Sequence, residues 1–216
     1  MTARMLELMH AEPPSWRRTD RLLGRGAAGR VFRARVEGTA ERCAVKLVSD
    51  AEPPPTERAA AERQLRALAA VRHPNLVEYR AAVLRDGGAA LLMTLCDGGS
   101  LAQLLARRGA LGETEARPLA RQVAAGLSFL HRHGAVHLRL TCGNCLLCSG
   151  GGGGGGEFTV RLSDYWVAGA VSRWRRGAAL EGAFWYSAPE VLRGAPCGRK
   201  VRAGTRATPI KAMTLA

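Results

Sequence analysis

The sequence lacks any apolar run long enough to cross a bilayer, and its first 14 residues lack the apolar core of a secretory signal. Glu7 and Glu12 also argue against an organelle transit peptide. These absences predict a cytoplasmic protein without a membrane partner, with the nucleus as the alternative location.

The six cysteines lack the pattern of a complete metal site. Cys142, Cys145 and Cys148 follow a C-x-x-C-x-x-C spacing. Zinc sites and iron–sulfur clusters take four ligands, and no fourth cysteine follows at a suitable distance. Thiols of an intracellular chain are normally reduced. We therefore expect core and loop thiols here, with a metal site as the alternative.

Acidic residues are also scarce, with 18 Asp and Glu against 32 Lys and Arg, and the net charge is +14. Such a surface attracts nucleic acid through phosphate neutralisation. However, the chain has no basic motif interleaved with aromatics and no helix-turn-helix pattern. We interpret the arginines as solvated side chains and do not expect nucleic acid as a partner. A basic protein that binds nucleic acid or acidic partners stays an alternative function.

What is present is enough apolar sequence for a packed core, since 47% of the residues are hydrophobic. Alternation predicts strands, and helical spacing predicts helices. The predicted strands are residues 31–36, 43–48, 78–84, 89–95, 145–148 and 158–162, and the predicted helices are 56–71, 100–108 and 113–133. The glycine run at 150–156 predicts a flexible tip between the last two strands.

A glycine motif opens the predicted sheet, with Gly24, Gly26 and Gly29 spaced G-x-G-x-x-G and followed by Val31. A dinucleotide-binding fold uses the same glycines, but there the motif opens a helix, whereas residues 31–36 alternate like a returning strand. Such glycines let backbone amides lie over phosphate groups without a side-chain clash. The alternative is a glycine-rich hairpin that holds no ligand.

The next predicted strand contains Ala44-Val45-Lys46. A lysine in an apolar strand is costly to bury without an anionic partner. A nucleotide phosphate would be such a partner, and the alternative is that Lys46 reaches outward from an edge strand.

Four further motifs follow in order. They are His73-Pro74-Asn75-Leu76-Val77, the stretch V-H-L-R-L-T-C-G-N-C-L-L at 136–147, Asp164-Tyr165-Trp166 and Ser187-Ala188-Pro189-Glu190. With the glycine motif and the Lys46 strand, they resemble the motifs of the protein kinase family at its spacings, from about residue 22 to residue 200. The resemblance implies an α+β, protein-kinase-like bilobal fold with a β-rich N-lobe and an incomplete α-helical C-lobe. We expect an N-terminal extension at 1–18, the N-lobe at 19–96, a partial C-lobe at 97–200 and a disordered non-family tail at 201–216.

The resemblance also implies ATP and Mg²⁺ as cofactors. Magnesium would be held by Asn144 and Asp164. In the family, a glutamate of the helix before residue 73 pairs with the strand lysine; a gap-free count puts Gln64 there, and a shifted helix would offer Glu62 instead. The nucleotide-binding residues implied are Gly24, Gly26, Gly29, Val31, Ala44, Lys46, Met93 as gatekeeper, Cys96 in the hinge, and Leu146.

Three mismatches concern the catalytic loop, where Leu138, Arg139 and Thr141 stand in place of the family's Arg, catalytic Asp and Lys. Arg139 cannot accept a proton, so no catalytic residue is intact. The expected protein is a pseudokinase that binds ATP and has a scaffold or regulatory role with a protein partner, such as an active kinase or signalling protein. The alternative is a weakly active serine/threonine kinase.

The family pattern stops after Lys200. Without the helices that follow there in the family, we expect exposed apolar faces and therefore low stability, aggregation or dependence on a partner. Lys200-Val201-Arg202 can be encoded by a splice-donor sequence. This suggests a truncated isoform whose last 16 residues are translated intron, and the alternative is a divergent tail.

Overall fold

The computed structural model describes residues 15–26, 29–49, 56, 58–85, 88–133, 135, 137, 140–149 and 158–165. They fall into two compact units, one formed by described residues of 15–72 and 78–95 and the other by described residues of 73–77 and 96–165. Several predictions therefore concern residues outside the described ones: those for 1–14, Leu138, Arg139, 150–156 and everything from Trp166 onward.

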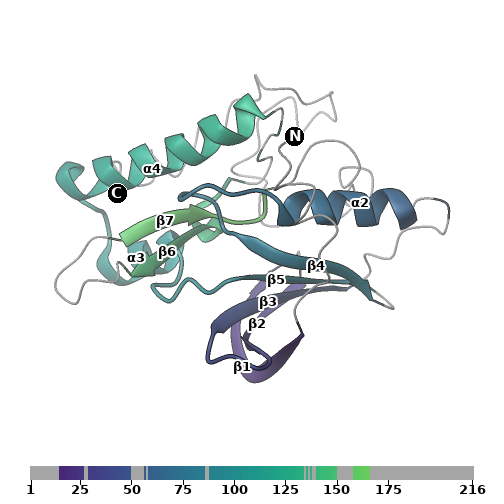
Figure 1. Ribbon diagram of the computed structural model, residues 1–216. Coiled ribbons are helices and arrows are strands. Elements are labelled where there is room, and N and C mark those ends of the chain that lie inside the picture. Colours follow the sequence, from purple (N-terminus) through teal and green to yellow (C-terminus); the bar gives the residue numbers. More distant parts are fainter. Residues whose placement is uncertain are drawn as a thin grey trace. The chain divides into compact units, whose positions relative to one another are not determined.

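The first unit contains a five-stranded antiparallel sheet in the order β1-β2-β3-β5-β4 (Figure 1). Side chains alternate between the two faces of each strand, and β5 buries residues on both faces. The strands are β1 Trp16–Gly26, β2 Gly29–Val36, β3 Arg42–Ser49, β4 Tyr79–Arg85 and β5 Gly88–Thr94. One face packs a cluster of buried side chains: Phe32, Ala34, Cys43, Val45, Ala81, Ala90 and Leu92.

Helix α2, Arg58–Ala69, packs beside β4 in the same unit and buries Leu65 and Leu68 (Figure 1). The predicted helix extended to Val71, which was wrong by two residues. After Ala69 the hydrogen bonds join residues three apart, as in a 3₁₀ turn: the N–H of Val71 donates to the Leu68 carbonyl at 3.2 Å. The Arg72 guanidinium then donates to the Ala69 carbonyl at 2.6 Å, which satisfies a carbonyl that the helix leaves open.

The second unit begins with two helices, α3 Leu101–Arg108 and α4 Glu113–Arg132. Ser100 and Gln103 start α3 through a capping box, in which each side chain accepts a hydrogen bond from the other residue's backbone N–H. The turn η2, Cys142–Asn144, leads into the antiparallel hairpin of β6, Cys145–Ser149, and β7, Phe158–Leu162. In the described part of the chain, no helix is long and apolar enough to span a membrane.

Helix α4 lies beside β7 and presents apolar residues to it at helical spacing (Figure 1). Gly126 allows the close approach. A Cβ atom there would lie 2.9 Å from the Asn75 carbonyl oxygen and 3.0 Å from the Leu162 Cδ1 atom. The buried residues of α4 are Ala116, Leu119, Val123, Gly126 and Leu130.

A polar network ties residues 73–77 and α4 to β7. The Asn75 side chain, 8% exposed, donates to the Val160 carbonyl at 3.0 Å and to the Gln122 Oε1 atom at 3.1 Å. Gln122 in turn accepts from the Val160 N–H and donates to the Phe158 carbonyl. Leu76 bridges Leu162 in parallel. The H-P-N motif is thus an extra, parallel neighbour of the hairpin.

We expect Asn75→Ala to lower the free energy of unfolding by about 2 kcal/mol, because it leaves the Val160 carbonyl without this donor in a buried place. Gln122→Ala should act through the same network, so the two changes should be non-additive in a double-mutant cycle. Chemical denaturation measures both. Arg121→Ala, at the exposed neighbouring position of α4, is the control and should change stability by less than about 0.5 kcal/mol. Equal stabilities of Asn75→Ala and Arg121→Ala would contradict this role of the network.

Candidate functional site

In the first unit, the structure brings several predicted nucleotide-binding residues onto one face of the sheet. Val31 lies opposite Lys46, and Ala44 lies opposite Met93. Cross-strand partners share a face, and residues two apart on a strand share one too. These four side chains therefore lie on the face opposite the apolar cluster defined above. Gly24 lies opposite Val31, which brings the glycine motif next to this face.

Lys46 lies on β3, which is the central strand of the sheet, and it is only 4% exposed. The alternative that it reaches outward from an edge strand is therefore wrong. Burying an ammonium group costs about several kcal/mol unless anionic or polar groups surround it. Its role in binding a nucleotide phosphate stays a prediction.

The glycines of the motif differ in what they do. Gly29 has φ +120°, and a Cβ atom there would lie 2.1 Å from the Leu47 carbonyl oxygen of β3. Only glycine fits this place, whether or not a ligand binds. A Cβ atom on Gly24 would meet no atom within 4 Å. The fold itself therefore does not require glycine at position 24. The open space beside it would allow a ligand to approach the backbone closely.

Cys96, the predicted hinge residue, belongs to the second unit, where the chain after it runs along β6. The Gly98 N–H donates to the Leu147 carbonyl at 2.9 Å, and the Leu147 N–H donates to the Gly99 carbonyl at 2.8 Å. The Asp97 carboxylate accepts the Ser149 N–H at 2.9 Å. This bond holds the pKa of Asp97 below its usual range. The segment 96–99 is thereby fixed to the hairpin.

The two predicted magnesium ligands lie at one end of the same hairpin. Ser163 donates both its N–H and its hydroxyl to the Asn144 carbonyl, at 2.9 and 3.2 Å, just before Asp164. Asp164 has φ +60°, a left-handed conformation that is uncommon outside glycine and clusters at functional sites. Leu146, the predicted adenine contact, is half-buried on β6 and bridges Ser100.

The donor set suits magnesium. Asn144 and Asp164 offer amide and carboxylate oxygens, and Mg²⁺ prefers hard oxygen ligands. It is usually held by one or two carboxylates, with nucleotide phosphates and water completing the shell. In the described part of the chain, no group of three or more His, Cys, Asp or Glu is placed to hold a metal.

Residues 17–203 match the family model described as "Protein kinase domain". The chain belongs to the protein kinase family. It is 33% identical over 196 residues to mitogen-activated protein kinase kinase kinase 3 of Mus musculus. The matched region covers 87% of this chain and 30% of that protein. It is 30% identical over 177 residues to dual specificity testis-specific protein kinase 1 of Rattus norvegicus, covering 80% and 27%.

The fold is similar to a solved kinase structure, the crystal structure of Rad53 1-466 in complex with AMP-PNP. The TM-score is 0.65 with 25% sequence identity, over 82% of this chain and 42% of that chain. The predicted fold class, α+β and protein-kinase-like with a β-rich N-lobe and an incomplete helical C-lobe, is confirmed. This kinase-like chain spans less than a third of the length of the two curated relatives above.

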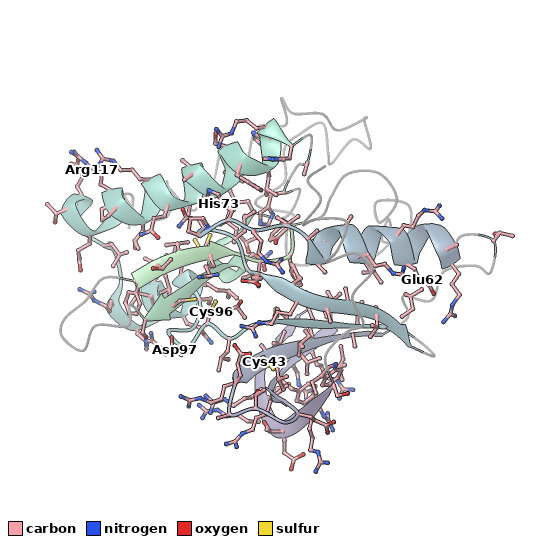
Figure 2. All side chains as sticks on the ribbon, viewed as in Figure 1. Cys43, Glu62, His73, Cys96, Asp97 and Arg117 are labelled. Carbon is pink, nitrogen blue, oxygen red and sulfur yellow. The ribbon has the colours of Figure 1, made fainter. Side chains whose placement is uncertain are left out.

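The predicted counterpart of a kinase's regulatory helix is α2. Glu62 pairs with Arg58 one turn earlier, with 3.5 Å between the guanidinium Nε and the carboxylate, and both side chains are more than 40% exposed (Figure 2). The position of Gln64 on α2 is described but its side chain is not. Which of the two faces Lys46 stays a prediction.

Thr141 has a role that sequence reasoning missed. It was interpreted only as the loss of a lysine. In the structure its hydroxyl accepts the Asn144 N–H at 3.2 Å and so caps η2. The signal was available, because threonine three residues before the turn's end is a typical N-cap. Thr141 therefore shapes the backbone that carries a predicted magnesium ligand.

Tyr165, in the kinase family's D-F-G aromatic place, is fully buried, and its hydroxyl donates to the Val77 carbonyl at 2.6 Å. A phenylalanine could not make this bond. His137 is also buried, at 2% exposed. Leu68 and Tyr79 are likewise buried, at 2% and 1% exposed.

Proposed function

We propose that this chain is a pseudokinase that binds ATP with Mg²⁺ and has a scaffold or regulatory role in the cytoplasm. The observation that carries the proposal is the burial of Lys46, 4% exposed on the central strand, in a chain that has Arg139 in the catalytic Asp position. A positive charge at this place in the sheet, on the same face as Val31, Ala44 and Met93, is suited to attract a nucleotide phosphate. Transfer of the phosphoryl group would need, in addition, a carboxylate in the place that Arg139 occupies in the sequence.

Phosphoryl transfer needs a carboxylate that orients the attacking hydroxyl and accepts its proton. A guanidinium accepts no proton at physiological pH, and its charge has the wrong sign. Losing a positioned base costs about 10²–10⁴ in rate. When bound, Mg²⁺ would neutralise charge on the nucleotide phosphates, and Asn144 and Asp164 are the residues that would hold it.

The test of nucleotide binding is a thermal shift with ATP, with and without Mg²⁺. Ligand at 100 times its Kd stabilises by about 2.7 kcal/mol, which is a rise in Tm of roughly 5–10 °C for a domain of this size. Lys46→Ala should abolish the rise. Asp164→Asn should abolish only its Mg²⁺-dependent part, because asparagine keeps the left-handed backbone but not the charge.

Arg42→Ala is the matched control, since Arg42 lies on the same strand β3 but is exposed. It should keep the full ATP response. If ATP gives no rise in the unmodified protein, or if Lys46→Ala keeps the rise, the proposed nucleotide site is refuted.

A weakly active serine/threonine kinase is the second candidate, and it is favoured by the relatives, whose printed names are those of kinases. A radiolabelled transfer assay with a generic protein substrate separates the two. The pseudokinase proposal expects no transfer above that of Lys46→Ala. Transfer that depends on Lys46 would overturn it and support the weak enzyme.

A further inference from the structure

Two cysteines of the second unit lie unusually close together. The Sγ atoms of Cys96 and Cys148 are 2.8 Å apart, and both residues are half-buried free thiols (Figure 2 labels Cys96). A disulfide bond is about 2.05 Å long, so the two sulfurs need to approach by less than an ångström to bond. The two residues are 52 positions apart in the sequence, so the contact is created by the fold.

The backbone holds both cysteines in place. Three hydrogen bonds connect the segment after Cys96 to β6: Gly98 to Leu147, Leu147 to Gly99, and Ser149 to the Asp97 carboxylate. They lie next to both cysteines, so they hold the backbone that carries the two sulfur atoms in a defined register. Little backbone movement is then needed for a bond to form.

The surroundings also make the two thiols unequal. The hydrogen bond between the two thiols, together with the positive charge of Arg161, lowers the pKa of Cys148. The same hydrogen bond and burial raise the pKa of Cys96. A thiolate is the reactive form of cysteine, so we expect Cys148 to be the attacking thiol and Cys96 to be the thiol that then reacts with it.

The other described cysteines are set apart from this chemistry. Burial raises the pKa of Cys145 to about 12, and it raises the pKa of Cys43 and of Cys142. All three are buried, whereas both members of the pair are partly accessible. Their partial accessibility, together with the lowered pKa of Cys148, should therefore direct oxidation to Cys148 and its neighbour Cys96.

We propose that Cys96 and Cys148 form a reversible disulfide when the protein meets hydrogen peroxide. The Cys148 thiolate attacks one peroxide oxygen, the O–O bond breaks, and water leaves after protonation, giving a sulfenic acid on Cys148. The Cys96 sulfur then attacks the Cys148 sulfur, the S–O bond breaks and a second water leaves. Two thiols and one hydrogen peroxide thus give one disulfide and two waters. A dithiol reductant reverses the change by thiol–disulfide exchange.

The disulfide joins the hinge residue covalently to β6, and so it would fix the segment 96–99 on the hairpin more firmly than hydrogen bonds do. This inference goes beyond the proposed function, because the bond forms from the fold of the second unit alone. Its test therefore uses no nucleotide. Loss of ATP binding would leave it standing, and absence of the disulfide would leave the nucleotide proposal standing.

The first experiment is tryptic peptide mapping of the whole chain by mass spectrometry after hydrogen peroxide, without reductant. Trypsin places Cys96 alone in the peptide 86–107 and places Cys148 with Cys142 and Cys145 in 140–161. We expect these two peptides to be linked, with fragmentation assigning the bond to Cys148. The link should disappear with a dithiol reductant and in both Cys96→Ser and Cys148→Ser. Cys145→Ser is the control and should keep it.

The second experiment traps the intermediate with a sulfenic-acid reagent. Cys96→Ser should be labelled on Cys148, roughly tenfold more than Cys148→Ser is labelled on Cys96, because the pKa values differ in that direction. Labelling in the reverse order would overturn the assigned nucleophile. Oxidation that reaches only other cysteines, or that gives sulfonic acid on Cys148 without a link to Cys96, would overturn the disulfide.

Discussion

Gly29→Ala is expected to lower the free energy of unfolding by about 4 kcal/mol. Two effects combine at this one position. The left-handed φ of +120° strains any residue with a Cβ atom, and the Cβ atom itself would lie 2.1 Å from the Leu47 carbonyl oxygen. That oxygen belongs to the backbone of β3, so it cannot turn aside as a side chain could. Relief requires β2 and β3 to separate next to Lys46.

Gly24→Ala is the matched control, since it makes the same chemical change in the same motif. Its Cβ atom would enter open space, so stability should change by less than about 0.5 kcal/mol. If ATP binds along this backbone, Gly24→Ala should nonetheless reduce the thermal shift caused by ATP. Denaturation curves of both variants measure the first effect, and a Gly29→Ala protein as stable as Gly24→Ala would show that the strand pair adapts.

This contrast shows how far the glycine motif could be interpreted from sequence. The spacing predicted a strand return and phosphate-binding amides, and β1 and β2 do pair antiparallel from Gly26 and Gly29. The spacing could not say which glycine the fold itself requires. That depends on the position of Leu47, which is a neighbour across the sheet and has no signature in the motif.

Elements with strong periodicity were predicted to within about two residues, because their apolar faces follow local rules. The fold class followed from the ordered motifs. Lys46 was also predictable, since an apolar strand around a lysine indicates burial, although the central place of β3 depends on the strand order. The element boundaries and the burial of Lys46 could thus be predicted from the residues close to them in the sequence.

The features that could not be predicted depend on contacts between distant segments. The Cys96–Cys148 pair requires the register of the chain after the hinge along β6. The conformation of Asp164 depends on Ser163 reaching Asn144 and on Tyr165 reaching Val77. Thr141 had a recognisable capping pattern that the comparison with a lysine obscured. Only the last of these had a signal in the sequence.

Tyr165→Ala is expected to lower the free energy of unfolding by about 4 kcal/mol, because a fully buried aromatic side chain leaves a cavity in the second unit. Tyr165→Phe separates the ring from the hydroxyl. It keeps the volume and removes only the donor to the Val77 carbonyl, so the loss should be about 1–2 kcal/mol. Chemical denaturation of the three proteins measures both terms, and their difference gives the contribution of the ring.

The Phe variant also tests what the hydroxyl does for Asp164. Residues 163–165 are held on one side by Ser163, which donates to Asn144, and on the other by Tyr165, which donates to Val77. Asp164 keeps its left-handed backbone between these two anchors. If the anchors position its carboxylate for magnesium, Tyr165→Phe should reduce the Mg²⁺-dependent part of the ATP thermal shift by more than its Mg²⁺-independent part. An equal reduction of both parts would assign the hydroxyl to stability alone.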